Sequence, residues 1–389
     1  MGQEGEFHTL TGYRQLEGGE ITEAMEDYLE MLTRHMMEKG YMRIGALAEQ
    51  LHVRPSSASK MSARLRELDL IQFEKYGRIT GFVDGSTNLV AWGNRTAEIT
   101  DDTSQMYEMV KAVIRCGGEL TPQAAGEALV RWSENYPRYF PRNAGPTTRN
   151  VIERLKAGED PCAVGRSGGR YELGTSNGAI MRIAGAGLCN PGDLEGAIKT
   201  AVAMTECSHA TQIAFSAACA IACGIAQAMT GRCDVHTVVK ACVYGAKRGE
   251  AIGLEKARVA AGARVLPKIL RAVELAYLAD SPEEAEVLLN DELGTDSSAI
   301  AQTCALAIGL FVAADGDSAG SILGGANIGG DTDTIACIAG MLAGARNGYS
   351  ALPESWRTLF RQANPDLDLC GAAAEMVRLI ENRYHTDLF

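Results

Sequence analysis

The chain has 389 residues, of which 46% are hydrophobic, and its formal net charge is −12. This length exceeds what one hydrophobic core usually supports, so we expect two domains. The acidic balance excludes a protein that coats nucleic acid along its whole surface. The first twenty residues are polar and acidic and show no secretory signal pattern. Eleven cysteines without a Cys-x-x-Cys pair complete the pattern, which predicts a cytoplasmic protein with reduced thiols.

The N-terminal region predicts a short flexible leader and then a small domain. Residues 1–19 combine several glycines with an acidic excess, which indicates the leader. Residues 20–85 show the pattern of three helices and a β-hairpin. The helices are expected at Thr22–Met37, Ile44–Leu51 and Ser56–Leu68, and the strands at Ile71–Tyr76 and Ile79–Val83. This order is typical of a winged helix-turn-helix domain.

A local reversal of charge favours DNA binding by this domain. Residues 41–80 carry seven basic and four acidic side chains, a net charge of +3. The third predicted helix is the candidate recognition helix, because hydroxyl and basic side chains near its start suit base edges and phosphates. The alternatives are a solvated helix face and a surface that contacts another protein. The candidate DNA-binding residues are Ser56, Ser57, Lys60 and Arg64.

The same region resembles the N-terminal domain of the iron- and manganese-dependent repressors of the diphtheria-toxin-repressor type. The resemblance rests on Met25–Glu30, Glu38–Tyr41, Ala48–Glu49, Val53, Pro55–Ser57, Lys60–Met61 and Glu74–Tyr76. It implies duplex DNA as a partner and places Asp27 and Glu30 where those repressors bind a regulatory metal. The following domain, which supplies their other metal ligands, has no counterpart here, so metal sensing does not follow.

From Asp101 onward the apolar periodicity predicts helices and no convincing strand. We therefore predict a mainly α protein, in which residues 86–389 form an all-α orthogonal helical bundle. Ala210–Met229 is long enough to span a membrane, but its alanine content favours a buried central helix and no membrane contact. The predicted helices are Ser104–Arg115, Pro122–Asn135, Thr147–Leu155, Asp193–Met204, Ala210–Met229, Asp234–Ala246, Pro267–Leu278, Pro282–Leu289, Ala299–Ala313, Ser318–Gly324, Ile335–Ala345 and Ala372–Asn382.

Two acidic clusters at predicted helix starts indicate a metal site. The sequence TDDT occupies Thr100–Thr103, and GGDTDT occupies Gly329–Thr334. Carboxylate and hydroxyl oxygens at this density suit a hard cation such as Mg²⁺ or Mn²⁺. The alternative is helix capping, because Asp and Thr are preferred N-caps. One cap needs only one such residue, and the glycine pair indicates tight backbone geometry. We therefore favour one dinuclear site.

Residues 77 to about 360 resemble the ADP-ribosylglycohydrolase family, an all-α fold with a dinuclear metal centre that removes ADP-ribose from modified residues. The resemblance implies a hydrolase of a glycosidic bond to ADP-ribose or a related nucleotide, with two Mg²⁺ or Mn²⁺ ions. The motifs follow the family's order: Tyr76–Thr80, Thr100–Thr103, Gly145–Arg149, Ser176–Arg182, His209, Gly329–Thr334 and Leu352–Trp356.

Carried over by motif, the resemblance implies the roles of single residues. The metal ligands are Thr100, Asp101, Asp102, Asp331, Asp333 and Thr334, and the catalytic carboxylates among them are Asp101, Asp102 and Asp331. The residues of the ribose-phosphate cleft are Asn177, Gly178, Met181 and His209. For His209 the alternative is a capping or core histidine. For Arg182, contact with a diphosphate and pairing with a surface acid both stay open.

One family feature has no counterpart in this sequence. The family usually begins with a Gly-Asp-Ala-Leu-Gly helix and a glutamate that acts at the ribose, and Glu98 does not match that glutamate by motif. Ser176 and Ser208 stand where Gly and Thr are more usual. The complete ligand set favours a hydrolase fused to a DNA- or partner-binding module. The missing helix favours a transcriptional regulator whose hydrolase-like domain senses an ADP-ribose-type ligand without turnover. The linkage cleaved and the oligomeric state stay open.

Overall fold

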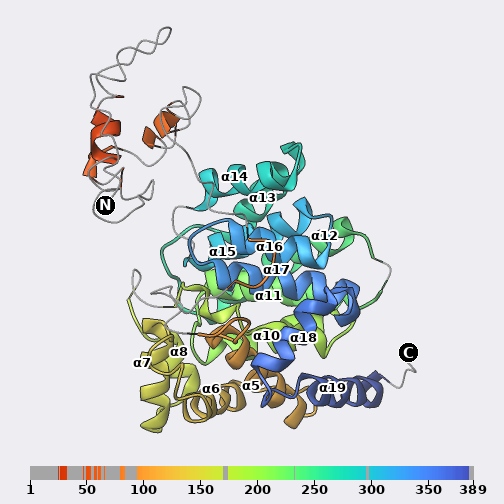
Figure 1. Ribbon diagram of the computed structural model, residues 1–389. Coiled ribbons are helices and arrows are strands. Elements are labelled where there is room, and N and C mark those ends of the chain that lie inside the picture. Colours follow the sequence, from red (N-terminus) through yellow and green to blue (C-terminus); the bar gives the residue numbers. More distant parts are fainter. Residues whose placement is uncertain are drawn as a thin grey trace, which may run out of the picture. The chain divides into compact units, whose positions relative to one another are not determined.

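The computed structural model shows helices joined by loops (Figure 1). The chain divides into two compact units, unit 1 (Met1–Arg78) and unit 2 (Ile79–Phe389), and each is treated by itself. The residues that the structure describes are 25, 27–32, 47, 50–53, 57, 58, 60–62, 65, 79–83, 94–169, 174–231, 233–294 and 298–384.

Unit 1 has a small hydrophobic core among its described residues. This core draws on each of the three predicted helices, and its described members are helical. Ser57 and Lys60 are exposed, so they lie on the outer face of the third helix. Ser56, Arg64, the leader and the strand expected at Ile71–Tyr76 lie outside the described residues. The buried core consists of Met25, Tyr28, Leu29, Leu47, Ala58 and Leu65.

Unit 2 consists of helices and connecting loops in its described part, which confirms the predicted mainly α fold. The described residues contain no β-strand and only two isolated bridges. Its elements are α5 (Asp101–Arg115), α6 (Pro122–Asn135), α7 (Pro146–Lys156), α8 (Pro161–Arg166), η1 (Asn177–Ala179), α9 (Ala184–Leu188), α10 (Leu194–Glu206), α11 (Gln212–Ala228), α12 (Val235–Lys256), α13 (Val265–Leu278), α14 (Pro282–Leu293), α15 (Ile300–Ala313), α16 (Ser318–Asn327), α17 (Thr332–Asn347), η3 (Tyr349–Ala351), α18 (Glu354–Ala363) and α19 (Leu369–Tyr384).

The strand predicted at Ile79–Val83 does not form, and that prediction was wrong. The Ile79 N–H donates to Asn327 Oδ1 at 2.8 Å, and Asn327 Nδ2 donates to the Ile79 carbonyl at 2.9 Å. One amide side chain thus occupies both backbone groups that a neighbouring strand would need. Phe82 lies against Trp356, with ring centroids 5.9 Å apart. This segment is therefore fixed by side chains of the helical bundle.

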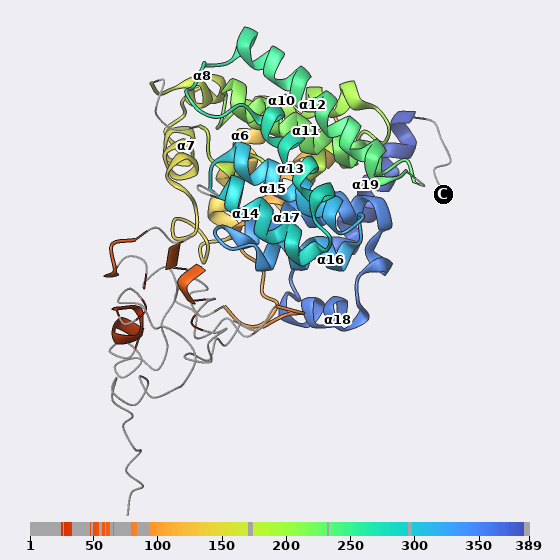
Figure 2. The same ribbon diagram turned by 90° about the horizontal axis from the view of Figure 1, so that it is seen from above.

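Helix α11 is the centre of unit 2, as predicted for the alanine-rich run. It lies inside the bundle in both views, and nearly all of its residues are buried (Figure 1 and Figure 2). Thr211 caps it, because the Thr211 hydroxyl accepts from the Ala214 N–H at 3.1 Å. Helices α9, α10, α12, α13, α15 and α17 contact it. Within the described residues, no helix has both the length and the apolar character needed to cross a membrane.

Helix α12 extends to Lys256, beyond the predicted end at Ala246, because its glycines fit against α11. A Cβ atom on Gly245 would lie 2.2 Å from the Cys219 carbonyl oxygen, and one on Gly249 would lie 2.3 Å from that of Phe215. Gly253 continues this row four residues later. Glycine weakens an isolated helix. Here its missing side chain lets two backbones touch, so the buried contact stabilises the last turns.

Some short helices and one proline position were not predicted correctly from the sequence. Helices α8, α9 and α18 were not predicted. Helices α8 and α9 have six and five residues, too few to show a sustained apolar period. Pro282 is the first residue of α14, as expected. Pro267 is the third residue of α13 and not the first, so that expectation was wrong. Its position is still tolerated, because N–H groups in the first turn have no partner within the helix.

The close approach of α11 and α12 can be tested with one methyl group. Gly249→Ala should lower the free energy of unfolding by about 1–3 kcal/mol, because the new Cβ overlaps the Phe215 carbonyl. Gly344→Ala in α17 is the matched control, since no atom lies within 4 Å of its added Cβ. It should be neutral or stabilise by up to about 1 kcal/mol. Denaturant unfolding measures both, and equal effects would contradict the packing argument.

Candidate functional site

The two acidic clusters stand at helix starts that do not use them as caps. Thr100 is the N-cap of α5 and Asp331 the N-cap of α17, and neither side chain accepts a hydrogen bond from the first turn. Other helices of unit 2 are capped in the usual way, for example α6 by Thr121 and α16 by Asp317. Side-chain capping therefore does not account for the two clusters.

Both clusters meet in one cavity of about 970 Å³, here called the carboxylate cavity. The structure brings nearly all the predicted site residues together around it, although they come from distant parts of the chain. His209 is the exception, because it is fully buried and does not line the cavity. The predicted residues that line it are Thr100, Asp101, Asp102, Asn177, Gly178, Met181, Asp331, Asp333 and Thr334.

Three carboxylates of this cavity, Asp101, Asp102 and Asp333, hold their protons more tightly than exposed ones. Burial, followed by the charge of Asp333, raises the pKa of Asp101 to about 7. Burial, followed by the charge of Asp101, raises the pKa of Asp102 to about 7. Asp333 opens to the cavity, yet loss of solvation and then the charge of Asp102 raise its pKa to about 8. Without a cation, some of these groups stay protonated near neutral pH.

Hydrogen bonds orient two of these carboxylates. Asn177 Nδ2 donates to Asp331 Oδ2 at 2.6 Å, which ties η1 to the start of α17. The Thr100 hydroxyl donates to Asp102 Oδ2 at 3.1 Å. The other oxygen, Asp102 Oδ1, is buried and has no hydrogen-bond partner. A buried carboxylate oxygen without a donor is costly unless another positive group satisfies it.

The glycine pair before Asp331 has the tight geometry expected from the sequence. Gly329 and Gly330 have φ values of 91° and 73°, which side chains rarely adopt. One turn earlier, a Cβ on Gly325 would lie 2.4 Å from the Ala336 Cα, so α16 and α17 are in close contact. The reversal between these helices therefore requires glycine, and it aims Asp331 at the TDDT cluster.

Basic and aromatic side chains also line the carboxylate cavity, and the sequence reasoning did not assign them to the site. Trp356 belongs to the motif Leu352–Trp356, so the sequence could have indicated it as a site residue. Arg142 and Arg357 could not have been identified, because a single arginine outside a motif does not indicate a function. Arg357 Nε donates to the Leu352 carbonyl at 3.1 Å and its guanidinium lies 5.4 Å from the Tyr349 ring centroid. The lining residues of this kind are Phe82, Arg95, Arg142, Tyr349, Trp356, Arg357 and Phe360.

Glu98 also lines the cavity, but it is held as a permanent anion. Arg95 donates to it through its backbone N–H at 2.6 Å, and Arg138 Nη2 donates at 2.9 Å. Burial acts to raise the pKa of Glu98, but the hydrogen bonds from Arg95 and then Arg138 lower it to about 2. Glu98 is therefore no proton donor at ordinary pH.

Arg182 lies behind the cavity, in the core. It is fully buried and donates to Gln105 Oε1 at 2.6 Å and to Ser208 Oγ at 2.8 Å. Both roles left open by the sequence, a diphosphate contact and a surface ion pair, were wrong. Burial lowers the pKa of Arg182 to about 10, so it stays charged at neutral pH. Burial and then this charge lower the pKa of His209 well below its usual value, so His209 is neutral.

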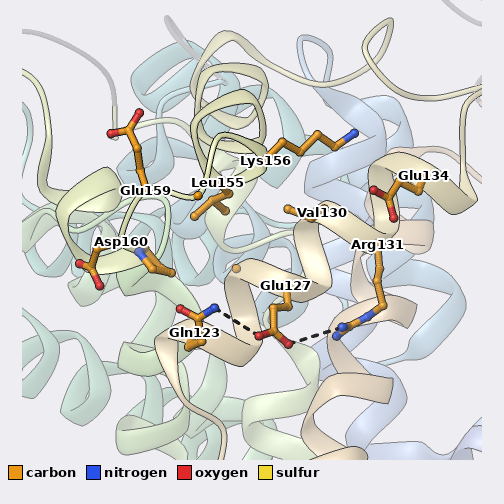
Figure 3. Close-up of a pocket in the computed structure, with 12 residues that line it drawn as sticks. Gln123, Glu127, Val130, Arg131, Glu134, Leu155, Lys156, Glu159 and Asp160 are labelled. Atoms are coloured by element: carbon orange, nitrogen blue, oxygen red, sulfur yellow. Dashed lines mark hydrogen bonds and ion pairs between the residues drawn. The ribbon is translucent and has the colours of Figure 1, made fainter.

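A second cavity, of about 620 Å³, lies between α6, α7 and α8 (Figure 3). Figure 3 shows Glu127 between Gln123 and Arg131, at 3.2 Å and 3.7 Å. Glu159 accepts from Arg154 at 3.0 Å, and Asp160 caps α8. Since these acids already have partners, they form no converging set of ionisable groups like that of the carboxylate cavity.

Comparison with known proteins shows the family of this chain. The family model described as ADP-ribosylglycohydrolase matches residues 44–386, and the chain belongs to that family. The match begins earlier than the resemblance seen from motifs. Membership supports a hydrolase that acts on an ADP-ribose-type linkage. An uncharacterized protein of Escherichia coli, YegU, is 26% identical over 312 residues, covering 79% of this chain and 89% of that protein.

Shorter matches relate the chain to HTH-type transcriptional regulators. The HTH-type transcriptional regulator MntR of Shouchella clausii is 46% identical over 55 residues, and that of Bacillus subtilis is 44% identical over 55 residues. These matches cover 14% of this chain and 38% and 39% of the regulators. The chain thus shares about two fifths of the length of those regulators, and the similarity extends to one short segment.

The raised carboxyl pKa values predict an unusual pH dependence in metal-free protein. Asp101, Asp102 and Asp333 ionise near pH 4 when unfolded but at about 7, 7 and 8 when folded, so the folded chain binds more protons between these values. Stability, and with it the Tm, should fall as the pH rises from 5 to 8. Thermal unfolding in a chelator at several pH values measures this. Asp102→Asn should lose part of the slope, and an unchanged slope would contradict the coupling.

Proposed function

We propose that unit 2 hydrolyses the glycosidic bond between an ADP-ribosyl group and its carrier, with two Mg²⁺ or Mn²⁺ ions as cofactors. One observation carries the proposal: Asp101, Asp102, Asp331 and Asp333 meet in one cavity, from two helix starts that do not use them as caps. Gathering like charges in a buried place costs free energy, and bound cations offset this cost.

The donor set fits hard divalent cations. Every proposed ligand offers an oxygen atom, and Asp102 Oδ1 is buried without a partner, as expected for an atom that meets a cation. As they stand in the described part of the chain, no three Asp, Glu, His or Cys side chains form a group that could hold a metal ion. Cation binding at this site therefore requires the carboxylates to move closer together. The proposed ligands are Thr100, Asp101, Asp102, Asp331, Asp333 and Thr334.

The other lining residues suit an ADP-ribosyl ligand. Guanidinium groups such as Arg142 and Arg357 recognise phosphate oxygens. Rings such as Phe82 and Trp356 offer flat apolar surface to a base. The volume of about 970 Å³ lies within the range of small-molecule sites. The cavity thus combines an acidic region that suits a sugar with arginine side chains and aromatic rings that suit a nucleotide.

The chemistry follows from the charge that develops at the ribose. Breaking the bond at C1 creates oxocarbenium character, which the carboxylates Asp101, Asp102 and Asp331 stabilise. Asn177 holds Asp331 in position through its hydrogen bond of 2.6 Å. When bound, the cations supply Lewis-acid activation of a water and fix the ribose hydroxyls. Glu98 contributes a fixed negative charge and no proton, because its arginine partners keep it ionised.

We propose duplex DNA as the partner of unit 1. The support is the similarity of a 55-residue segment to MntR regulators, together with the local net charge of +3 over residues 41–80. Ser57 and Lys60 are exposed on a helix whose other face joins the small core, so they are available to phosphates. Ser56 and Arg64 belong to the same proposed surface by sequence.

The metal proposal predicts a joint loss of binding and turnover. Asp331→Asn and Asp102→Asn should weaken Mg²⁺ or Mn²⁺ binding at least tenfold by calorimetry, since each removes a charged ligand. Release of ADP-ribose from modified arginine or serine substrates should fall at least about 100-fold, as seen by mass spectrometry. Asp234→Asn is the control, because Asp234 only caps α12 and Asn also serves as an N-cap.

The outcomes separate two versions of the function. A sensor without turnover would show metal-dependent binding of ADP-ribose in wild type but no product. Product formation that is unchanged in Asp331→Asn would defeat both versions, since each makes that carboxylate a metal ligand. Turnover that is insensitive to a chelator would defeat the metal proposal alone.

The DNA proposal predicts affinity that depends strongly on salt. Lys60→Ala with Arg64→Ala should weaken duplex binding and reduce the slope of log K against log salt by about 2, because two phosphate contacts are lost. Lys199→Ala, an exposed position in unit 2, removes a charge elsewhere and should leave the slope unchanged. Fluorescence anisotropy over a salt series provides the measurement. A slope that survives the double substitution would exclude this surface.

A further inference from the structure

Ser176 and His209 form a pair that resembles a nucleophile and its base. Ser176 lines the carboxylate cavity, and its hydroxyl lies 3.0 Å from His209 Nε2. The other ring nitrogen, His209 Nδ1, lies 2.9 Å from Ser208 Oγ. His209 is fully buried, and its Nε2 bonds to the cavity-lining hydroxyl of Ser176. The direction of each hydrogen bond decides what such a pair does.

Arg182 fixes that direction. Guanidinium groups only donate, so Ser208 Oγ must accept from Arg182 Nη2 at 2.8 Å. The Ser208 hydroxyl is buried, and His209 Nδ1 at 2.9 Å is the nitrogen acceptor within its reach, so its own proton is assigned to that bond. A neutral imidazole that accepts at Nδ1 carries its proton on Nε2. His209 consequently donates to Ser176 Oγ.

The same arginine orients the opposite end of this chain of bonds. Arg182 Nη1 donates to Gln105 Oε1, which turns the Gln105 amide so that Nε2 donates to Asp101 Oδ2 at 3.2 Å. Both ends of the chain, Ser176 and Asp101, line the carboxylate cavity. The buried Arg182 guanidinium thus orients the Asp101 carboxylate at one place in the cavity and the Ser176 hydroxyl at another.

We propose that Ser176 is a substrate-binding residue whose hydroxyl donates to an acceptor oxygen of the bound nucleotide. His209 is a positioning residue that acts through Ser176, and it is neither a base nor a direct ligand contact. Because Ser176 accepts from His209, its own proton is left for an acceptor in the cavity that it lines. Ser176 is therefore no activated nucleophile. This inference rests on the proposed function of the cavity and adds a residue to it.

Substitutions at Ser176 test the contact. Ser176→Ala should raise the Kd for ADP-ribose, measured by calorimetry with Mg²⁺, about five- to tenfold, as expected for one lost hydrogen bond. KM should rise by a similar factor and kcat should stay within about threefold, since the contact is made in the ground state as well. Ser176→Thr keeps the hydroxyl and should restore most of the affinity. A 100-fold fall in kcat for Ser176→Ala would instead identify a nucleophile and overturn the proposal.

His209→Gln tests the direction of the bonds. A glutamine amide can accept from Ser208 and donate to Ser176, so kcat should stay within about threefold of wild type. A base at this position would lose about 10²- to 10⁴-fold in kcat on this change. Nitrogen-15 NMR of the histidine ring should show the proton of His209 on Nε2 and no titration between pH 5 and 8. A proton on Nδ1 would overturn the proposed direction.

These results also separate the inference from the proposed function. Wild-type protein that binds ADP-ribose, together with Ser176→Ala that binds it equally well, defeats the inference and leaves the function standing. Wild-type protein that binds no ADP-ribose with Mg²⁺ or Mn²⁺ defeats both.

Discussion

The packing of unit 2 must overcome the mutual repulsion of the carboxylates that it brings together in the cavity. Asp101 and Asp102 begin α5, and Asp331 and Asp333 begin α17, so the fold must press two negatively charged helix starts together. The favourable contacts come from elsewhere. Helix α17 contacts α5, α11, α15 and α16, and the close contact of Gly325 with Ala336 fixes its first turns. Apolar packing thus holds in place a site that electrostatics alone would open.

Arginine side chains near this site lie either in the core or near the surface, and the two groups have different effects on the acidic residues. Arg182 is buried behind the cavity and bonds to neutral groups, so it orients the network that ends at Asp101 and Ser176. Arg95 and Arg138 lie near the surface and bind Glu98 directly, which keeps that carboxylate ionised. Acids in one cavity therefore differ in protonation because their partners differ.

The sequence by itself determined the helical class, the central buried helix and the composition of the site. These features depend on local information. Apolar spacing decides which faces are buried along α6 or α13. Proline and capping residues mark starts such as Pro122 and Pro282, and the density of oxygen ligands in TDDT and GGDTDT exceeds what capping needs. The glycine pair Gly329–Gly330 also predicted the tight backbone geometry before Asp331, because glycine adopts positive φ values without steric cost.

The tertiary structure alone decided the rest. The length of α12 depended on whether Gly249 meets a backbone on α11, and the fate of Ile79–Val83 depended on Asn327, which lies far along the chain. The burial of His209 behind Ser176, and of Arg182 behind both, follows from the packing of the bundle. A sequence lists which groups can donate or accept, but only their positions in space decide which partner each one meets, because hydrogen bonds and steric contacts act over a few ångströms.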